Sequence, residues 1–167
     1  VRRSKGHSQS VIRTGKLSIR PTRFDLSALV EDLLQNFAPQ IEAAESSVTL
    51  QAGHPVVGHW DEFRIEQVIS NLLTNALRYG AKSPITVKVY SENGQALVEV
   101  QDLGIGIGEE NQKRIFQQFE RVSAKHAVAG LGLGLFISEQ IVTAHGGSIT
   151  VQSRIGEGAL FRVCLPL

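Results

Sequence analysis

Apolar residues recur every three or four positions in three long stretches of the chain, and this period predicts helices. The stretches cover residues 25–45, 61–80 and 131–144. The second ends at Gly80, a residue type that often terminates a helix. A shorter helix is expected within residues 109–119. The remaining segments have a different period.

Apolar and polar residues alternate in most of those segments, as in strands with one buried face. The predicted strands are residues 16–21, 47–53, 85–92, 95–102, 148–154 and 159–167. Asn93-Gly94, a strong short-range hairpin signal, joins two of them. Helices and antiparallel hairpins alternate without regular βαβ units. This order predicts an α+β fold, a sandwich of one mixed sheet with helices on one face.

The composition is typical of one soluble domain, with 167 residues, 42% hydrophobic and 20% charged. No apolar run approaches the roughly 20 residues that a membrane span needs, and no signal-peptide pattern is present. The sequence contains one cysteine, Cys164, which excludes an internal disulfide and suits a reducing compartment. We therefore expect a cytoplasmic domain.

Charge is distributed unevenly along the chain. The residues before Asp25 include seven basic and no acidic side chains, whereas ten basic and sixteen acidic side chains follow from Asp25 onward. A basic leader can contact nucleic acid or anionic lipid. Because no aromatic residues interleave these charges, we interpret the leader as a solvated linker and expect no nucleic-acid partner.

Two asparagines stand four residues apart in the predicted helix 61–80, where asparagine is a mediocre helix former. Asn71, Asn75 and Arg78 fall within a stripe about 60° wide, and Asn75 lies beside the apolar boundary. A buried amide without a partner costs about 1–3 kcal/mol. A neighbouring loop would satisfy it, and so would a hydrated Mg²⁺ that arrives with phosphates. The paired amides and the following cation favour the second interpretation.

Two glycine-rich segments stand at the ends of predicted elements. "DLGIGIG" (102–108) follows a strand, and "GLGLGL" (130–135) opens a helix. Glycine lets the backbone approach a ligand closely, and a helix N-terminus offers free N–H groups to an anion. Each segment alone also fits an ordinary turn. The P-loop pattern GxxxxGK[ST] is absent from the sequence, so a nucleotide would have to bind in another way.

Taken in order, five segments resemble the boxes of the ATP-binding catalytic domain of sensor histidine kinases, a superfamily shared with gyrase and MutL ATPases. They are "NLLTNALRYG", "DLGIGIG", "IFQQFERV", "GLGLGLFISEQIVTAHGGSITVQS" and "GEGALF". The resemblance implies a two-layer sandwich of Bergerat type. It also implies that residues 24–167 form the ATP-binding catalytic domain, preceded by a basic linker and the end of a dimerisation region at residues 1–23.

The resemblance further implies a set of site residues. They are Asn71, Asn75, Arg78, Tyr79, Asp102, Gly104, Gly106, Phe119, Gly130, Leu131, Gly132 and Gly134.

Within that set, Asn75 would coordinate Mg²⁺, and Asn71 and Arg78 would hold the phosphates as catalytic residues. Tyr79 would pack on the adenine. Asp102 would accept a hydrogen bond from the adenine amino group. The glycines would let the chain turn beneath the base or hinge a lid over the phosphates, with Phe119 as one of the lid anchors.

Several of these positions also have simpler interpretations. Asp102 stands two residues before a glycine, in a segment typical of turns, and Tyr79 would simply cap the core. Phe116, a second possible lid anchor, also fits core packing. Leu103 and Ala159 depart from the family pattern, which usually has Asn at the first position and Thr or Ser at the second.

The resemblance implies transfer of the γ-phosphoryl group of Mg-ATP to a histidine. Gyrase-type ATPases carry a Glu where this chain has Asn71, whose amide cannot accept a proton, so we expect little ATP hydrolysis. None of the five histidines is followed by an acidic residue, as the family's acceptor is, so we expect the acceptor outside this fragment.

The expected partners are the dimerisation region of the chain's own full-length protein and a response regulator. The parent would be a homodimer, and whether it has a membrane anchor stays open. Two other functions stay open: a serine kinase of the anti-sigma type, and a non-catalytic regulatory module of the same fold.

Overall fold

The computed structural model describes residues 17–80, 82–117 and 131–167. A five-stranded sheet is built in the order β2 (Ser47–Ala52), β4 (Pro84–Glu92), β5 (Gln95–Asp102), β7 (Ala159–Pro166) and β6 (Ser148–Ser153). Strands β2 and β4 are parallel, and the other neighbours are antiparallel. Strands β1 (Thr22–Asp25) and β3 (Val57–Trp60) form a separate antiparallel pair.

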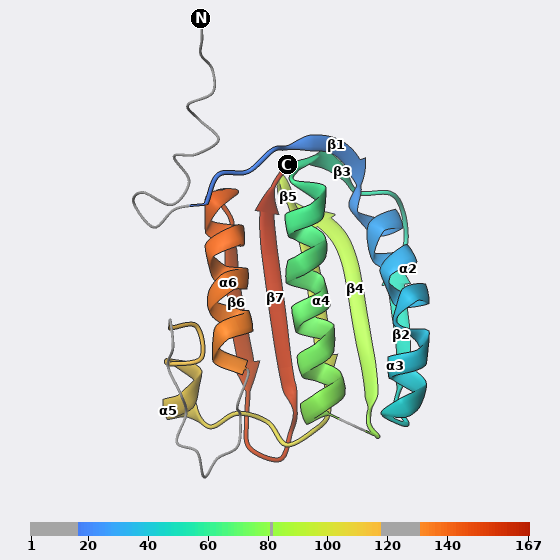
Figure 1. Ribbon diagram of the computed structural model, residues 1–167, viewed down its shortest axis with the longest axis vertical. Coiled ribbons are helices and arrows are strands. Elements are labelled where there is room, and N and C mark those ends of the chain that lie inside the picture. The colour runs from blue at the N-terminus through green and yellow to red at the C-terminus, as the bar shows by residue number, and fades with distance from the viewer. Residues whose placement is uncertain (1–16, 81, 118–130) are drawn as a thin grey trace, which may run out of the picture.

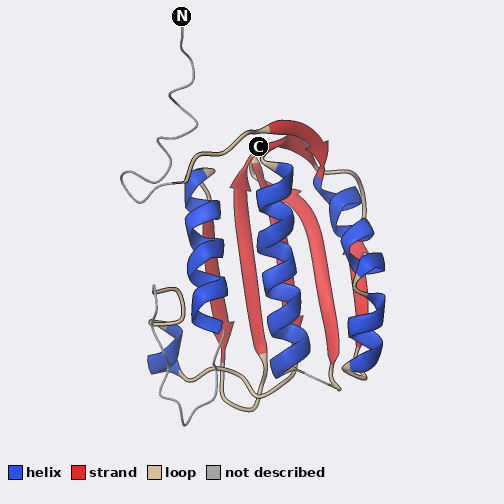
Figure 2. Ribbon diagram, in the orientation of Figure 1, coloured by secondary structure: helices blue, strands red, loops and turns tan. Residues whose placement is uncertain are grey.

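The long helices lie on one face of the large sheet (Figures 1 and 2). They are α2 (Leu26–Asn36), α3 (Ala38–Ala43), α4 (Glu62–Tyr79) and α6 (Leu131–Ala144), and the short α5 (Glu109–Gln112) lies at one end. Helix α4 is in the middle of this layer, between α6 and α2 (Figure 1). The predicted α+β sandwich, with a mixed and mostly antiparallel sheet and helices on one face, is therefore confirmed.

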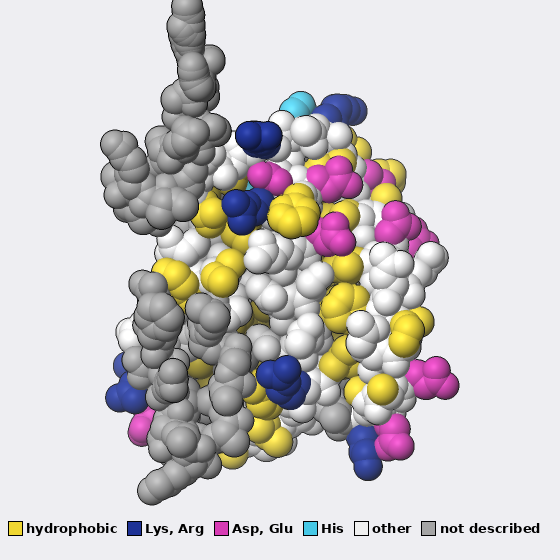
Figure 3. Space-filling model, in the orientation of Figure 1, with side chains coloured by type: hydrophobic (Ala, Val, Ile, Leu, Met, Phe, Trp, Pro, Cys, Tyr) yellow, Lys and Arg dark blue, Asp and Glu magenta, His cyan; other side chains and the backbone are white. Residues whose placement is uncertain are grey.

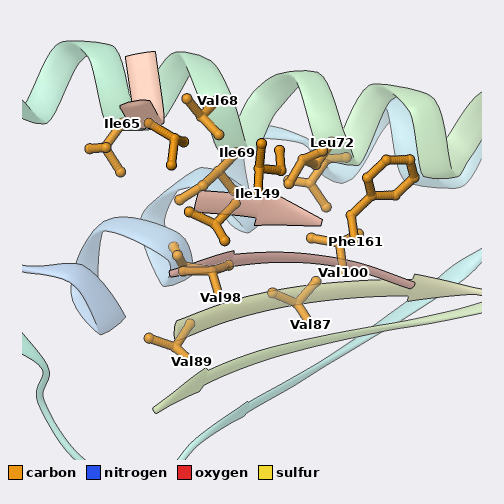
Figure 4. Packing of buried hydrophobic residues seen from close by; sticks show 14 of the residues in the cluster. Ile65, Val68, Ile69, Leu72, Val87, Val89, Val98, Val100, Ile149 and Phe161 are labelled. Carbon is orange, nitrogen blue, oxygen red and sulfur yellow. The ribbon is translucent and has the colours of Figure 1, made fainter. Parts of the chain in front are cut away.

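The core lies between α4 and the middle of the sheet. Apolar side chains from α4, such as Ile69 and Leu72, point toward Val87, Val98 and Val100 on the strands (Figure 4). All five are at most 2% exposed. Full burial of one such side chain contributes about 1.5–3 kcal/mol. The apolar face of α4 therefore fixes the position of this helix on the sheet.

Local signals account for most element ends. Asp61 caps α4, because its carboxylate accepts a hydrogen bond from Arg64 N at 3.2 Å. The predicted hairpin turn is present, with positive φ at both Asn93 (53°) and Gly94 (77°). No helix among the described residues is long and apolar enough to cross a membrane.

Three element predictions differ from the structure in detail, and one strand was missed. Residues 25–45 form two helices that divide at Phe37, where Pro39 enters the first turn of α3. The strand expected at 16–21 lies instead at Thr22–Asp25, and its partner β3 was not predicted. Of the helix expected within 109–119, the described part is helical at 109–112.

The opposite ends of α4 and α6 are joined through His145, which follows α6. His145 Nε2 accepts a hydrogen bond from Asp61 N at 3.0 Å, and Nδ1 lies 2.8 Å from Ile141 O. Asp61 Oδ2 also accepts a hydrogen bond from Arg20 N at 2.9 Å. These contacts tie the start of α4 to the end of α6 and to the entering chain, so the two helices run side by side with a fixed offset.

Candidate functional site

A pocket opens between the C-terminal half of α4 and the loop that follows β5. Its volume is about 340 Å³ including the part open to solvent. It is lined by Asn75, Tyr79, Asp102, Ile105, Gly106, Ile107, Ala159 and Phe161. Four of the predicted site residues, Asn75, Tyr79, Asp102 and Gly106, are therefore brought together although they come from separate sequence motifs.

Asp102 ends β5 with its side chain on the helix-covered face, and it is 6% exposed. Its Oδ1 accepts a hydrogen bond from Gly104 N at 2.8 Å. Burial raises the pKa of this carboxyl above its ordinary value, and hydrogen bonds from the backbone of Gly104 and Ala159 offset part of that rise. The pocket thus holds a buried acceptor whose described partners are backbone groups.

Asn75 is the second polar group of the pocket, and it is 8% exposed. Among the described residues, its Nδ2 has no hydrogen-bond partner. Such an unpaired group costs about 1–3 kcal/mol unless a ligand or water satisfies it. The burial expected from its position beside the apolar boundary is confirmed, and its Nδ2 is a donor that a ligand or a water molecule can satisfy.

Asn71 lies one turn earlier on α4 but faces a different neighbour. Its Nδ2 donates hydrogen bonds to Gly134 O and to Ser138 Oγ, each at 3.2 Å, so its amide joins α4 to α6. It does not line the pocket that contains Asn75. The two amides on the α4 stripe therefore differ: the first has protein partners on α6, and the second has an unsatisfied donor.

Arg78 and Tyr79 lie at the C-terminal end of α4, beside the mouth of the pocket. Arg78 is exposed, and its guanidinium carbon is 6.0 Å from the centre of the Tyr79 ring, at the limit of a cation–π contact. Tyr79 is half-buried and forms part of the pocket wall. A cation at this place can reach a negatively charged group that extends out of the pocket.

The glycine loop after β5 is held against two other segments. A Cβ at Gly104 would lie 2.1 Å from Tyr79 O, and Gly106 has a φ of 75° with a hypothetical Cβ 2.0 Å from Arg154 O. Only glycine fits such close approaches. Gly156 N also donates to Ile105 O at 2.8 Å. The loop that carries Ile105 is therefore fixed between the end of α4 and the turn between β6 and β7.

The remaining predicted site residues lie in or beside the segment that the sequence analysis interprets as a lid. Phe119 and Gly130 lie outside the described residues. Leu131 and Gly132 are in the first turn of α6, of which the backbone is described. Gly134 is the acceptor for Asn71, and a Cβ there would lie 3.7 Å from the Asn71 amide carbon. The backbone of α6 at Gly134 therefore lies in direct contact with Asn71 on α4.

Phe116 packs in the core beside the pocket. Its ring centre is 6.4 Å from that of Phe161, in an edge-to-face arrangement. Phe161 in turn lines the pocket. This contact favours the core-packing interpretation of Phe116.

Several residues of the site could not be singled out from sequence. The apolar pocket wall includes Ile105 and Ile107, which stand between glycines where no periodicity identifies them. Ser153 accepts a hydrogen bond from Ile107 N at 2.8 Å, and Gln112 Nε2 donates to Ile107 O at 2.7 Å. Alternation along the last strand was the available signal for Phe161, because it places Ala159 and Phe161 on one face.

The chemistry of the donor set limits how a metal can bind. Within the described residues, no group of three or more His, Cys, Asp or Glu side chains is arranged to hold an ion. The side-chain amides of Asn71 and Asn75 each contain one carbonyl oxygen, a hard ligand that suits Mg²⁺. The residues present therefore fit a metal that brings most of its oxygen ligands with it, such as one bound to phosphates.

The chain is similar to known proteins over most of its length. Residues 60–167 match the model of the family "Histidine kinase-, DNA gyrase B-, and HSP90-like ATPase". The sensor protein RprX of Bacteroides fragilis is 35% identical over 161 residues, which cover 91% of this chain and 30% of RprX. The circadian input-output histidine kinase CikA of Synechococcus elongatus is 33% identical, covering 94% of this chain and 22% of CikA. The chain thus spans less than a third of these relatives.

Solved structures give the same result for the fold. The catalytic domain of the histidine kinase ThkA matches with a TM-score of 0.78 and 26% identity, covering 89% of this chain and 96% of that domain. ThkA in complex with the response regulator protein TrrA matches with a TM-score of 0.73 and 26% identity, covering 87% of this chain and 41% of ThkA. The chain belongs to the family of histidine kinase-, DNA gyrase B- and HSP90-like ATPases, as a catalytic domain of the sensor histidine kinase type.

Proposed function

We propose that this domain binds Mg-ATP in the pocket between α4 and the glycine loop and transfers its γ-phosphoryl group to a histidine outside this sequence. The observation that carries the proposal is the pairing of a buried acceptor, Asp102, with a buried and unsatisfied donor, Asn75, in one pocket. A preformed apolar pocket with a few convergent polar groups is the usual form of a small-molecule site.

The adenine base is the part of ATP that fits the pocket. Asp102 accepts a hydrogen bond from the exocyclic amino group, while Tyr79 and Ile107 pack against the ring. Guanine would present a carbonyl oxygen in place of that amino group and leave two acceptors facing each other. Because unpaired buried polar groups are costly, the site should favour ATP over GTP by a large factor.

The phosphates and their metal would extend from the base toward the exposed side of α4. Asn75, with Asn71, would contribute carbonyl oxygens to the Mg²⁺ shell, and Arg78 would neutralise phosphate charge. Mg²⁺ would supply most of the charge neutralisation that phosphoryl transfer needs. Position 71 holds an amide, which cannot act as a general base for water, so the domain should hydrolyse ATP slowly.

The acceptor would be an imidazole on the dimerisation region of the full-length protein. Its ring nitrogen would form a bond to the γ-phosphorus as the bond to the β,γ-bridging oxygen breaks. ADP would leave with that electron pair, and the imidazole would lose its proton. ThkA, a structural neighbour, has been solved with a response regulator, which supports a response regulator as the next acceptor.

The same proposal assigns residues 24–167 to the catalytic unit and residues 1–23 to the linker and the end of the dimerisation region. The parent protein would act as a homodimer, with this domain in the cytoplasm. The dimeric state and the cytoplasmic location are proposals about the longer protein, since this chain spans less than a third of the length of these relatives.

Calorimetric titration with Mg-ATP and Mg-GTP tests the binding step. We expect binding of Mg-ATP, much weaker binding of Mg-GTP, and a loss of about 10- to 100-fold in Mg-ATP affinity for Asn75→Ala. Thr74→Ala, at an exposed neighbouring position, is the matched control and should bind normally. Unchanged affinity in Asn75→Ala would contradict the proposal.

The transfer step is tested by adding the purified dimerisation region of the full-length protein and radiolabelled ATP. We expect labelling of that region that is lost in acid, as phosphohistidine is. Acid-stable label would point to a serine kinase. No binding of nucleotide at all would favour a regulatory module.

A further inference from the structure

Ser138 is a fully buried polar residue in an apolar part of α6. It is 0% exposed, as are Leu135, Ile141 and Val142 on the same helix. Burying a hydroxyl among such residues costs free energy unless it is hydrogen-bonded. Ser138 Oγ accepts a hydrogen bond from the side-chain amide of Asn71 at 3.2 Å. The polar side chain at this position is therefore tied to the first of the two amides on α4.

We infer that Ser138 is a positioning residue: its hydroxyl, together with Gly134 O, holds the Asn71 amide in place for the metal–phosphate part of the ligand. The inference rests on the proposed function. The Asn71 Nδ2 has two hydrogens, and two acceptors, Gly134 O and Ser138 Oγ, lie at the same distance of 3.2 Å. Both donors of the amide are therefore used within the protein.

This arrangement determines which atom Asn71 can offer to a ligand. If the amide turned over, its carbonyl oxygen would face Gly134 O, and two acceptors would be in contact. The orientation with Nδ2 toward α6 is thus favoured, and Oδ1 is the group that Asn71 has left for a ligand. An oxygen suits a cation or its bound water and does not suit a bare phosphate oxygen.

The neighbouring amide of Asn75 lacks such contacts. Asn75 Nδ2 has no partner among the described residues, so its amide is not held in one place as that of Asn71 is. Asn71 is held before any ligand arrives. Fixing a group in its binding orientation reduces the entropy that binding must remove, and so increases affinity.

The start of α6 lies close enough to α4 for these contacts. Gly134 O accepts from Asn71 Nδ2, and a Cβ at Gly134 would lie at an ordinary contact distance of 3.7 Å from the amide carbon. One turn later along α6, the small side chain of Ser138 reaches the same amide. Two residues of α6, Gly134 and Ser138, therefore accept hydrogen bonds from the same Asn71 amide.

The test compares Ser138→Ala with Thr143→Ala, a matched control on the exposed side of the same helix. Alanine favours helices, so both variants should fold, and circular dichroism checks this. We expect Ser138→Ala to weaken Mg-ATP binding about three- to tenfold and to leave adenosine binding within about twofold, because one net hydrogen bond is lost at the phosphate end. Equal losses for both ligands would indicate a merely structural role and overturn the inference.

Nuclear magnetic resonance of the ligand-free domain supplies a readout that does not depend on nucleotide. The side-chain amide signals of Asn71 should shift or broaden in Ser138→Ala, whereas the side-chain amide signals of Asn75 should not. In the control Thr143→Ala, the side-chain amide signals of both asparagines should stay unchanged. Unaltered Asn71 signals would contradict the inference.

A double-mutant cycle separates this inference from the proposed function. If Ser138 acts through Asn71, Ser138→Ala should cause no further loss of Mg-ATP affinity in an Asn71→Ala background. Additive losses would overturn the positioning role while leaving the nucleotide site intact. If Asn71→Ala alone leaves Mg-ATP affinity unchanged, Asn71 has no role at the phosphates, and the inference fails together with that part of the proposed function.

Discussion

Two carboxylates, three residues apart on β5, are buried to the same extent on opposite faces of the sheet. Glu99 is 7% exposed and Asp102 is 6% exposed. Glu99 faces away from the helices, whereas Asp102 faces the pocket beside α4. Their partners differ. Glu99 is hydrogen-bonded to two side chains, whereas Asp102 is hydrogen-bonded to backbone groups.

Glu99 belongs to a satisfied polar cluster. Its Oε2 accepts hydrogen bonds from Tyr90 Oη at 2.6 Å and from Arg162 Nε at 2.8 Å. Burial alone would raise the pKa of Glu99, but the hydrogen bonds from Tyr90 and Arg162 outweigh it, and the pKa is lowered. The same contact with Glu99 raises the pKa of Tyr90 to about 12. The charged form of Glu99 therefore stabilises the fold.

Asp102 shows the opposite balance. Burial raises its pKa, and the backbone N–H groups of Gly104 and Ala159 compensate that rise in part. It also shares its pocket with an unsatisfied amide, that of Asn75. Similar burial of the two carboxylates therefore accompanies opposite pKa shifts. The difference lies in their partners: Glu99 accepts from the side chains of Tyr90 and Arg162, whereas Asp102 accepts from backbone N–H groups.

The surface around α4 is consistent with this difference. On the helix-covered face, acidic and basic side chains are interspersed, and apolar side chains appear as separate groups (Figure 3). At the pocket, by contrast, the exposed apolar side chains Leu103 and Ile105 are 56% and 57% exposed. Apolar groups at the edge of a pocket with buried polar atoms suit a ligand such as a nucleotide base.

The strongest contrast is expected from Asp102→Asn. The Asn amide has one acceptor oxygen where the carboxylate has two. The hydrogen bond to adenine should therefore weaken, and ATP affinity should fall by about 10- to 100-fold. Calorimetry measures this loss. Nearly unchanged ATP affinity would show that Asp102 is merely a turn residue.

Glu99→Gln should show the reverse effect. Loss of the charged partner of Tyr90 and Arg162 should lower the free energy of unfolding by about 1–3 kcal/mol, measured by urea denaturation. ATP affinity should stay within about twofold, because Glu99 lies on the other face of the sheet. A large loss of ATP binding would contradict the separation of the two faces.

Acidification should separate binding from stability. In the proposed complex Asp102 accepts from adenine as a carboxylate, and its pKa is raised, so ATP affinity should begin to fall at a pH above the ordinary value of 3.8. The pKa of Glu99 is lowered, so its contribution to stability is complete above its ordinary value of 4.5 and is lost as the pH falls further. Titrations of ATP binding and of circular dichroism against pH check this order. Coincident losses would contradict it.

The smallest effect is expected from Leu103→Asn. Leu103 is 56% exposed, so the change costs little core packing. The family pattern has Asn at this position, and a polar contact regained near the nucleotide should raise ATP affinity about two- to fivefold. A decrease in affinity, measured by the same titration, would show that the apolar edge of the pocket itself contributes to binding.

Much of the fold could be predicted because strong local signals specify it. The period of α4 placed Asn75 at the apolar boundary, and the structure finds it buried. Asn93-Gly94 identified the hairpin turn. Strand β3 was missed because it has four residues and no clear alternation, and the division of the first helix at Phe37 depends on a single proline.

The site was predicted less completely, for a physical reason. The contact of Asn71 with Ser138 joins residues 67 positions apart and depends on how two helices pack, which no local pattern specifies. Ile105 and Ile107 line the pocket because the glycine loop is held against Arg154 and Gly156, again at long range. The sequence motifs identified candidate site residues, whereas the residues that contact them across the fold could be identified only from the structure.

A crystal structure of the domain with Mg²⁺ and a non-hydrolysable ATP analogue tests the central claim most directly. We predict the adenine in the pocket with its amino group donating to Asp102, and the phosphates and metal beside Asn75. A structure in which the analogue lies elsewhere, with the pocket filled by the protein's own side chains, would contradict the account.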